Sequence, residues 1–321
     1  MKNDMNYEIK NSFIKAKIKS FGAELNSLQK LDDSTDETIE YIWQANKDFW
    51  NRHSPILFPI VGRLKEDSYF YKNQKYSMTQ HGFARDKEFE VVKQESDFIE
   101  FRLKSDEKTL EIYPFLFELY ISYTLVKTKL IISYKVVNKN ADEMLFSIGA
   151  HPAFNWTFTN ESKKEDYFLE FEDIKTTKRY FLNDLGLVYK NENLEIKNNK
   201  ILLNEELFKN DALVFNDANI KTVSLKNKNR NENKKDNRFI KVDFENFPYL
   251  GIWSKPSGAP FICIEPWFGI ADEENSNQNL EDKKGMIRLE KDEVFSYYLP
   301  FPFRKTKSMI KELPCDHAFF L

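Results

Sequence analysis

The sequence predicts an all-β fold, a single antiparallel sandwich of many strands. Apolar and polar residues alternate with a period of two in segments spread along the whole chain. Aromatic residues, which favour strands, make up 15% of the 321 residues. The chain shows no strand–helix rhythm, no glycine-rich phosphate loop and no internal repeat, so the signatures of parallel α/β and solenoid folds are missing.

The alternating segments predict strands that have one buried face and one face in water. The clearest are residues 14–19, 99–103, 119–125, 130–136, 240–244 and 294–299. Clusters of turn-forming residues, such as 72–74 and 138–142, separate them. Helical signals are limited to single turns at 47–50 and 204–208.

One sandwich domain is expected to span residues 1–300. Residues 301–321 break the strand alternation and form an appendage that is either packed or partly disordered. Residues 226–238 are low in complexity, with six basic and two acidic side chains. This segment is either a solvated hairpin loop between strands at 223–225 and 240–242 or a contact for an anion or a partner.

Composition and charge exclude several classes of function. The net charge is −3, from 48 Lys and Arg against 51 Asp and Glu, so the basic excess of a nucleic-acid-binding protein is missing. No apolar run is long enough to span a membrane, and the first residues do not resemble a signal peptide. Two cysteines, Cys263 and Cys315, provide no disulfide framework. We expect a cytoplasmic monomer or homodimer that acts on a small molecule.

Glu265 is the most unusual carboxylate of the chain, because it follows the apolar run 259–264. We expect residues 261–264 to form a buried strand that Glu265 and Pro266 end, with the carboxylate facing a pocket beside Trp267. Burial would raise the pKa of this group and hydrogen-bond donors would lower it. A structural glutamate that accepts hydrogen bonds from a neighbouring loop explains the sequence equally well.

Two of the four histidines lie in apolar, turn-forming segments. His151 follows an expected strand at 144–148, where Gly149 lets the backbone leave the sheet and Pro152 fixes the turn. His81 lies in a turn before an expected strand at 89–92. Imidazoles act as acids or bases at neutral pH. Taken one at a time, each histidine is better explained as a half-buried residue bonded to a loop carbonyl.

Two arginines accompany these segments. Arg63 ends an apolar run, and Arg85 lies four residues after His81. A guanidinium fork suits sugar hydroxyls or a phosphate. The alternative for each is an ion pair with a nearby acid, such as Asp86 or Glu88 for Arg85.

The sequence gives little support for a metal site or for a Ser or Cys nucleophile. The spacings contain no H-x-H or H-E-x-x-H element, so no metal is expected. No G-x-S-x-G motif is present, and Cys263 falls inside the expected buried strand.

Five segments, taken in their order along the chain, resemble the aldose 1-epimerase (galactose mutarotase) superfamily, and within it the LacX-like branch. They are Phe21-Gly22-Ala23-Glu24-Leu25, residues 55–63, His81-Gly82-Phe83-Ala84-Arg85, residues 149–155 and Cys263-Ile264-Glu265-Pro266-Trp267. The resemblance runs from about Tyr7 to Tyr298. It implies a single-domain antiparallel β-super-sandwich of the galactose mutarotase-like type.

The resemblance also implies a reaction that needs no cofactor. A base removes the proton of the C1 hydroxyl of a sugar, an acid protonates the ring oxygen, and the ring opens, rotates about C1–C2 and closes as the other anomer. Glu265 then matches the base, His151 the acid, and His81 a second histidine near the ring oxygen. The substrate-binding residues implied are Arg63, Asp211, Arg85 and Trp267, the last of which is equally well explained as a core indole.

The expected function is therefore an aldose 1-epimerase that interconverts the anomers of a free hexose such as galactose or glucose. Arg63 and Arg85 motivate a first alternative, a hexose-6-phosphate 1-epimerase. A second alternative, from another class, is a non-catalytic carbohydrate-binding protein on the same sandwich.

Overall fold

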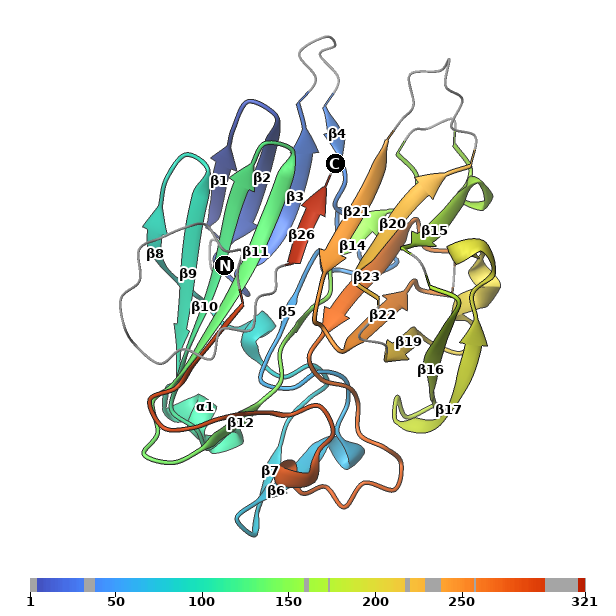
Figure 1. Cartoon of the computed structure of the whole chain (residues 1–321). Helices are drawn as coiled ribbons and strands as arrows, with labels where there is room; N and C mark the ends of the chain where they lie inside the picture. Colours follow the sequence, from blue (N-terminus) through green and yellow to red (C-terminus); the bar gives the residue numbers. More distant parts are fainter. Residues whose placement is uncertain are drawn as a thin grey trace.

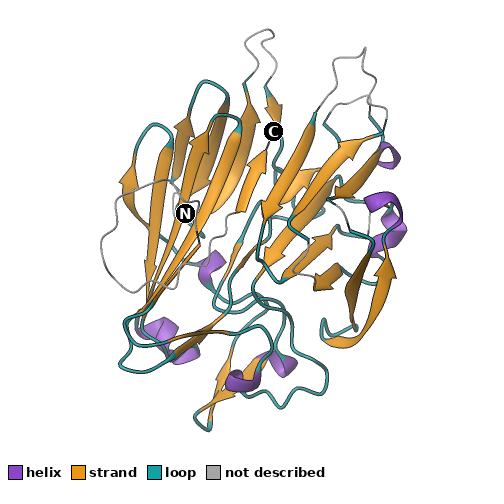
Figure 2. Cartoon of the chain, viewed as in Figure 1, coloured by secondary structure: helices purple, strands orange, loops and turns teal. Residues whose placement is uncertain are grey.

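The computed structural model describes residues 5–31, 38–158, 162–172, 174–216, 220–228, 238–256, 258–297 and 317–320. Strands dominate this part of the chain, and α1 (Glu107–Ile112) is its α-helix (Figure 2). Short 3-10 helices cover Lys65–Asp67, Ala84–Asp86, Lys164–Asp166, Lys197–Asn199, Glu205–Phe208 and Leu280–Asp282. Neighbouring strands of each sheet, such as β10 (Phe117–Val126) and β11 (Lys129–Asn138), pair antiparallel, which confirms the predicted fold class.

The larger of two main sheets has ten strands and runs across the front of Figure 1. Its order is β18-β15-β20-β21-β26-β11-β10-β9-β8, with β25 also paired to β11. The bounds not yet given are β8 (Glu90–Gln94), β9 (Phe98–Lys104), β15 (Tyr167–Phe171), β18 (Lys200–Leu202), β20 (Thr222–Asn227), β21 (Phe239–Phe244), β25 (Val294–Tyr297) and β26 (His317–Phe320).

The second main sheet has eight strands in the order β17-β16-β19-β22-β23-β13-β5, with β14 also paired to β23. Its strands are β5 (Ile56–Leu57), β13 (Gly149–Ala150), β14 (Ala153–Asn155), β16 (Thr176–Leu182), β17 (Val188–Glu195), β19 (Leu213–Asn216), β22 (Tyr249–Trp253) and β23 (Phe261–Trp267). Every residue of β23 is buried, and neighbouring strands pair along both its edges.

Three smaller sheets complete the described part of the chain. One has four strands in chain order, β1 (Asn6–Lys10), β2 (Ile14–Lys19), β3 (Glu24–Lys30) and β4 (Ile39–Glu40). The other two are two-stranded: the hairpin of β6 (Ser68–Tyr71) with β7 (Gln74–Ser77), and the long-range pair of β12 (Met144–Phe146) with β24 (Ile287–Leu289).

The core lies between the apolar faces of the two main sheets. Alternate residues of β10 are buried, as a period-two pattern requires. Among them, Leu119 and Tyr123 join the same buried cluster as Phe215 of β19 and Ile264 of β23. The sandwich therefore buries one face of each sheet and leaves the outer face of the eight-stranded sheet available for a site.

Most predicted strands are confirmed. The six alternating segments correspond to β2, β9, β10, β11, β21 and β25, and residues 298 and 299 of the last segment lie outside the described residues. The predicted helical turn at 204–208 is the 3-10 helix Glu205–Phe208. The alternation succeeds because each of these strands has one face in the core.

The prediction that Glu265 and Pro266 end a strand is wrong, since both lie inside β23. Ile264 donates its N–H to the carbonyl of Pro152, so the nitrogen of Pro266, two residues further on, faces the same edge. Along that edge β14 has ended and β13 pairs only at the end of β23, so no ladder hydrogen bond is lost at the proline.

The strand expected at 144–148 is also divided. β12 ends at Phe146, and Gly149 with Ala150 forms β13 of the other sheet, so Gly149 joins a sheet instead of leaving one. The reason is packing: a side chain on Gly149 would meet the indole of Trp267 at 2.7 Å, and only glycine permits that pairing.

The predicted hairpin around residues 226–238 is confirmed in its strands, because β20 and β21 pair antiparallel. Residues 229–237 of its loop lie outside the described residues. The same holds for 298–316, where the predicted boundary at residue 300 falls, so that boundary stays a prediction. Backbone pairing places β26 between β21 and β11 (Figure 1).

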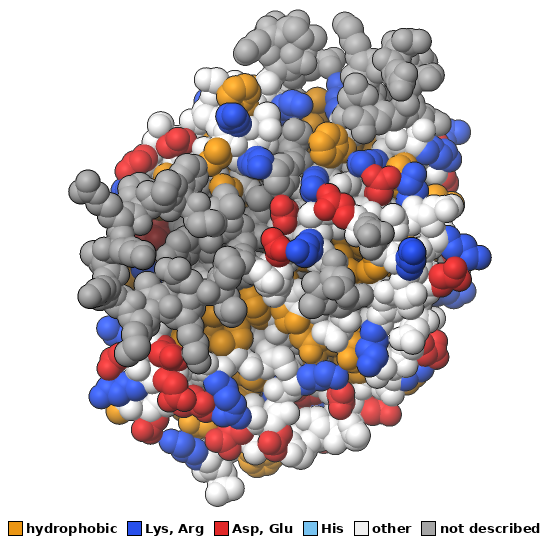
Figure 3. All heavy atoms as spheres, viewed as in Figure 1, with side chains coloured by type: hydrophobic (Ala, Val, Ile, Leu, Met, Phe, Trp, Pro, Cys, Tyr) orange, Lys and Arg blue, Asp and Glu red, His pale blue; other side chains and the backbone are white. Residues whose placement is uncertain are grey.

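The face in Figure 3 carries a mixture of acidic and basic side chains, interspersed wherever side chains are coloured. In the described part of the chain, no helix has the length and apolar character needed to cross a membrane.

Candidate active site

A cavity of about 290 Å³ lies on the outer face of the eight-stranded sheet. Side chains along β23 alternate between the two faces of the sheet. Ile262 and Ile264 therefore join the core, whereas Glu265 and Trp267 line the cavity. Its volume lies at the small end of the range for ligand pockets. Six of the seven predicted site residues line it, namely His81, Arg85, His151, Asp211, Glu265 and Trp267.

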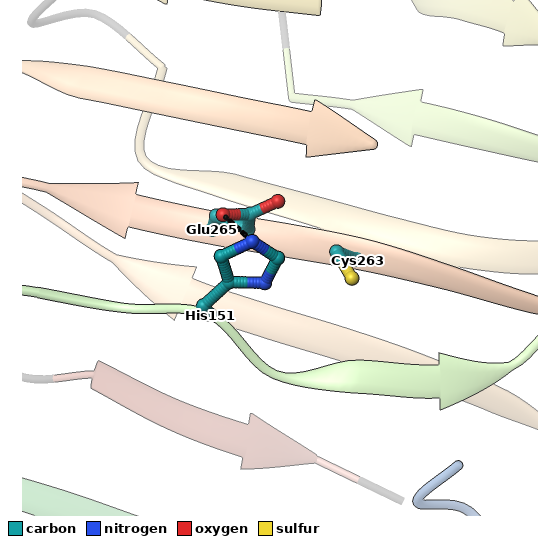
Figure 4. Close-up of side chains that lie close together, drawn as sticks. All are labelled: His151, Cys263 and Glu265. Carbon is teal, nitrogen blue, oxygen red and sulfur yellow. Dashed lines mark ion pairs between the residues drawn. The ribbon is translucent and has the colours of Figure 1, made fainter. Parts of the chain in front are cut away.

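His151 and Glu265 form the centre of the site. His151 lies in the turn that joins β13 to β14, where its backbone N–H donates to the carbonyl of Pro55 at 3.1 Å. Its Nε2 lies 3.1 Å from Oε2 of Glu265 (Figure 4). The carboxyl side chain is 1% exposed. The strand and the turn thus bring an imidazole and a carboxyl group within proton-transfer distance.

Burial shifts the pKa values of this pair in opposite directions. Burial raises the pKa of Glu265 well above its usual value, and the neighbouring Asp211 carboxylate adds to the shift. Burial, together with the positive charge of Arg85, lowers the pKa of His151 to about 3. Both shifts favour the uncharged forms. In these uncharged forms, the proton that the pair can exchange rests on the carboxyl group.

His81 is fixed by two hydrogen bonds with Gly62. The backbone N–H of His81 donates to the carbonyl of Gly62 at 2.8 Å, and the N–H of Gly62 donates to Nδ1 of the His81 ring at 3.1 Å. An Nδ1 that accepts leaves the proton on Nε2. Burial and the nearby His151 lower the pKa of His81 well below its usual value, so the ring is a neutral donor. The two imidazole rings are perpendicular, with centroids 5.5 Å apart.

Three of the five tryptophans line the cavity. Trp50 stacks on His151 with ring centroids 4.9 Å apart, and Trp253 meets the same imidazole edge-on at 5.9 Å. Trp267 lies over β22, where a side chain on Gly251 would meet the indole at 2.4 Å. Sequence reasoning missed Trp50 and Trp253. The available signal was a tryptophan in a turn-forming segment and another at the end of a strand.

Arg85 lines the cavity from the 3-10 helix Ala84–Asp86, and Asp211 lines it from a loop. Arg85 donates from Nη2 to the carbonyl of Gln80 at 2.6 Å. Its neighbour Arg52 pairs with Asp86 at 2.9 Å, and the Nε of Arg85 lies 3.8 Å from the same carboxylate. Arg85 therefore lies beside Asp86, as the ion-pair alternative predicts, and it also lines the cavity. Asp211 accepts the N–H of Ala212 at 2.8 Å through its side chain.

Arg63 is the predicted site residue that does not line the cavity. Its Nε lies 3.6 Å from the carboxylate of Asp67, and its side chain is 40% exposed. The predicted role of Arg63 in holding sugar hydroxyls therefore stays a prediction. In the structure, Arg63 instead forms an ion pair, which was the alternative.

Possible metal ligands also meet at this site. Ligand atoms of His151, Cys263 and Glu265 lie within 4.8 Å of one another (Figure 4). A thiolate is the form that binds metal. Burial, together with Glu265, raises the pKa of the Cys263 thiol well above its usual value, so the trio is poorly suited to hold a cation.

The fold and the site together define a class of protein: an antiparallel β-sandwich with an imidazole beside a buried carboxyl group in a small, aromatic-lined cavity. The chain belongs to the aldose 1-epimerase family, whose model matches residues 5–282.

Individual relatives agree with this membership. Protein LacX (plasmid) of Lactococcus lactis subsp. lactis is 32% identical over 294 residues, covering 89% of this chain and 95% of LacX. A galactose mutarotase related enzyme from Lactobacillus acidophilus is 36% identical, with a TM-score of 0.86 over 98% of this chain and 97% of that one. A galactose mutarotase-like protein from Lactobacillus casei ATCC 334 is 30% identical, with a TM-score of 0.81 over 91% and 97%.

Proposed function

We propose that this protein is a mutarotase that interconverts the α and β anomers of a free hexose such as galactose or glucose. The main support is the 3.1 Å distance between the His151 imidazole and the Glu265 carboxyl group inside the cavity. The hydroxyl oxygen and the ring oxygen of a cyclic sugar are both bonded to C1. An acid and a base that act on them must therefore lie side by side, as these two groups do.

The proton count of the pair suits both directions of the reaction. Transfer of the shared proton from Glu265 to His151 gives a carboxylate and an imidazolium. The carboxylate then takes the proton of the C1 hydroxyl, the imidazolium protonates the ring oxygen, and the bond between C1 and the ring oxygen breaks to give the aldehyde. The pair returns to its starting protonation state. Rotation about C1–C2 and the reverse steps give the other anomer.

Neighbouring groups would assist this reaction. The Nε2–H of His81 is a neutral donor for the ring oxygen, and donors aimed at developing charge stabilise a transition state. The Asp211 carboxylate would accept sugar hydroxyls, and Arg63 would hold others. Trp50, Trp253 and Trp267 offer aromatic faces to the apolar side of a sugar ring.

Anomerisation measured by NMR exchange or polarimetry tests the proposal. Glu265→Gln removes the proton acceptor but keeps the shape of the side chain, so at least about a hundredfold loss of rate is expected. Phe13→Ser, at an exposed site outside the cavity, is a control for expression and folding. Undiminished rates in Glu265→Gln would sink the proposal. Tight sugar binding by the wild type without rate enhancement would instead favour a non-catalytic carbohydrate-binding protein.

A second candidate substrate is a hexose 6-phosphate. Arg85 lines the cavity, and Arg52 and Arg85 share the carboxylate of Asp86. The negative charge of Glu24 also stabilises the charged form of Arg85, but Glu24 is already paired with Lys19 at 2.6 Å. This excess of positive charge suits an anionic group.

Competition between glucose and glucose 6-phosphate separates the two substrates. A phosphosugar epimerase should prefer the phosphorylated sugar by at least about tenfold, and Arg85→Ala should erase that preference. Equal competition in the wild type would exclude the phosphosugar.

We further propose that the enzyme works in the cytoplasm without a cofactor, as a monomer or homodimer. The acid–base pair completes the reaction without an external redox or metal group. Gel filtration with light scattering measures the oligomeric state.

A further inference from the structure

Asp272 and Lys283 form a buried ion pair behind the cavity wall, outside the acid–base machinery. Nζ of Lys283 donates to Oδ1 of Asp272 at 2.8 Å, and both side chains are 3% exposed. Nζ also donates to the carbonyl of Ile270 at 2.7 Å. Because desolvation offsets most of the attraction in such a pair, an apolar pair of similar volume would be about as stable. The ion pair therefore calls for an explanation other than stability.

Asp272 connects three segments of the chain. Its Oδ2 accepts the backbone N–H of Lys65 at 3.0 Å, and its own N–H donates to the carbonyl of Arg63 at 2.9 Å. Its carbonyl accepts the N–H of Val188 at 2.9 Å, beside the hairpin that supplies Gly186 to the cavity lining. One residue thus holds the backbone of residues 63–65 and the start of β17.

The segment that Asp272 holds is the one that binds His81. Gly62 precedes Arg63, and its N–H donates to Nδ1 of the His81 ring. Ala271, next to Asp272, packs so closely that a side chain on Gly62 would meet its nitrogen at 2.5 Å. The position of the Gly62 N–H therefore depends on two neighbours of Gly62, Arg63 and Ala271, both of which must be held in place.

We propose that Asp272, neutralised by Lys283, is a positioning residue that keeps the Gly62 N–H on Nδ1 of His81 and thereby keeps the His81 proton on Nε2, toward the sugar. Asp272 does not line the cavity and acts through Gly62. The effect on catalysis rests on the proposed function, whereas the effect on the His81 ring does not.

Two double variants separate this role from simple stability. Asp272→Leu/Lys283→Met replaces the ion pair by apolar side chains and removes the acceptor for the Lys65 N–H. Asp272→Asn/Lys283→Met is equally uncharged but keeps an amide oxygen at that position. Asn138→Ala is the matched control, because Asn138 is a buried side chain that holds the carbonyls of Asp142 and Leu289, away from the cavity.

The readouts are the ¹⁵N spectrum of the His81 ring, hydrogen exchange of the Gly62 amide, and kcat and KM for anomerisation. For Asp272→Leu/Lys283→Met we expect mixed tautomers, faster exchange and a kcat about 10 to 100 times lower, with KM changed less than about threefold. Asp272→Asn/Lys283→Met should keep the wild-type spectrum and a kcat within about threefold of wild type. Asn138→Ala should lower only the melting temperature.

A wild-type His81 spectrum and wild-type kcat in Asp272→Leu/Lys283→Met would overturn the proposal, as would equal losses in both double variants with an unchanged spectrum. If the wild type does not anomerise sugars at all, the proposed function fails, while the ring spectrum and Gly62 exchange still decide whether Asp272 positions His81.

Discussion

The indole of Trp50 stacks on the imidazole of His151, with ring centroids 4.9 Å apart and ring planes inclined by 29°. An aromatic face stabilises a cation placed over it. In the proposed reaction His151 becomes an imidazolium, so the stack would favour the charged form that burial disfavours.

Replacing Trp50 by leucine should therefore slow the reaction. Loss of the aromatic face should lower kcat about threefold to tenfold, with Trp50→Phe recovering most of it. NMR exchange rates at saturating sugar measure the change. Equal rates in the two variants would mean that the ring fills space and has no effect on the charge of His151.

The pH–rate profile should reflect the single proton of the His151–Glu265 pair. The pKa of His151 is lowered to about 3, so a second proton is taken up, and activity lost, only near that pH. The pKa of Glu265 is raised well above its usual value, so the alkaline loss begins above the range of an ordinary carboxyl group. The pKa of His81 is also lowered, so no loss is expected near pH 6.5. A loss of activity as the pH falls through 6.5 would contradict the assignment.

Glu24 should make stability depend on acid pH. Burial alone would raise the pKa of this carboxyl group, but hydrogen bonding to His53 and the charge of Lys19 lower it to about 2. A depressed folded-state pKa gives stability that is present above the unfolded value of 4.5 and is lost as pH falls toward 2. The loss amounts to about 3 kcal/mol. Denaturant unfolding at several pH values should show a shallower decline in Glu24→Gln, and parallel declines would contradict this.

Gly251→Ala should disturb the indole wall of the cavity. The added methyl group would meet ring carbons of Trp267 at 2.4 Å, so the indole must move away from β22. We expect about 1–3 kcal/mol of destabilisation and a higher KM. Combining it with Trp267→Phe, which supplies room, should restore much of the stability. Denaturant unfolding measures both variants, and additive losses would rule out this clash as the cause.

Strand positions were readable from sequence wherever a strand has one wet face. The pattern Ile14, Ala16 and Ile18 gives β2 within its observed bounds, because alternate residues enter the core. β23 lacks that signal, since both of its faces are buried, and its extent was predicted too short. A proline at an edge position without a ladder partner looks the same in sequence as a proline that ends a strand.

The candidate site was partly readable for a different reason. Glu265 and His151 stand out because charged or titratable groups are costly in apolar settings. Trp50 and Asp272 carry no such mark, since an aromatic side chain or an aspartate in a loop is ordinary. Their relevance comes from contacts with His151 and with the Lys65 backbone, which only the folded chain brings together. The choice of tautomer at His81 likewise depends on one backbone N–H from Gly62.

The two faces of β23 have different roles, and the alternation of side chains along the strand decides which residues lie on each face. Ile262 and Ile264, at even positions, pack in the core between the sheets, while Glu265 and Trp267, at odd positions, line the cavity. Substitution at odd positions can therefore change chemistry while the sandwich is kept. Deletion of a single residue early in the strand would exchange the two sets. The carboxyl group would then face the core, and both fold and chemistry would be lost in one step.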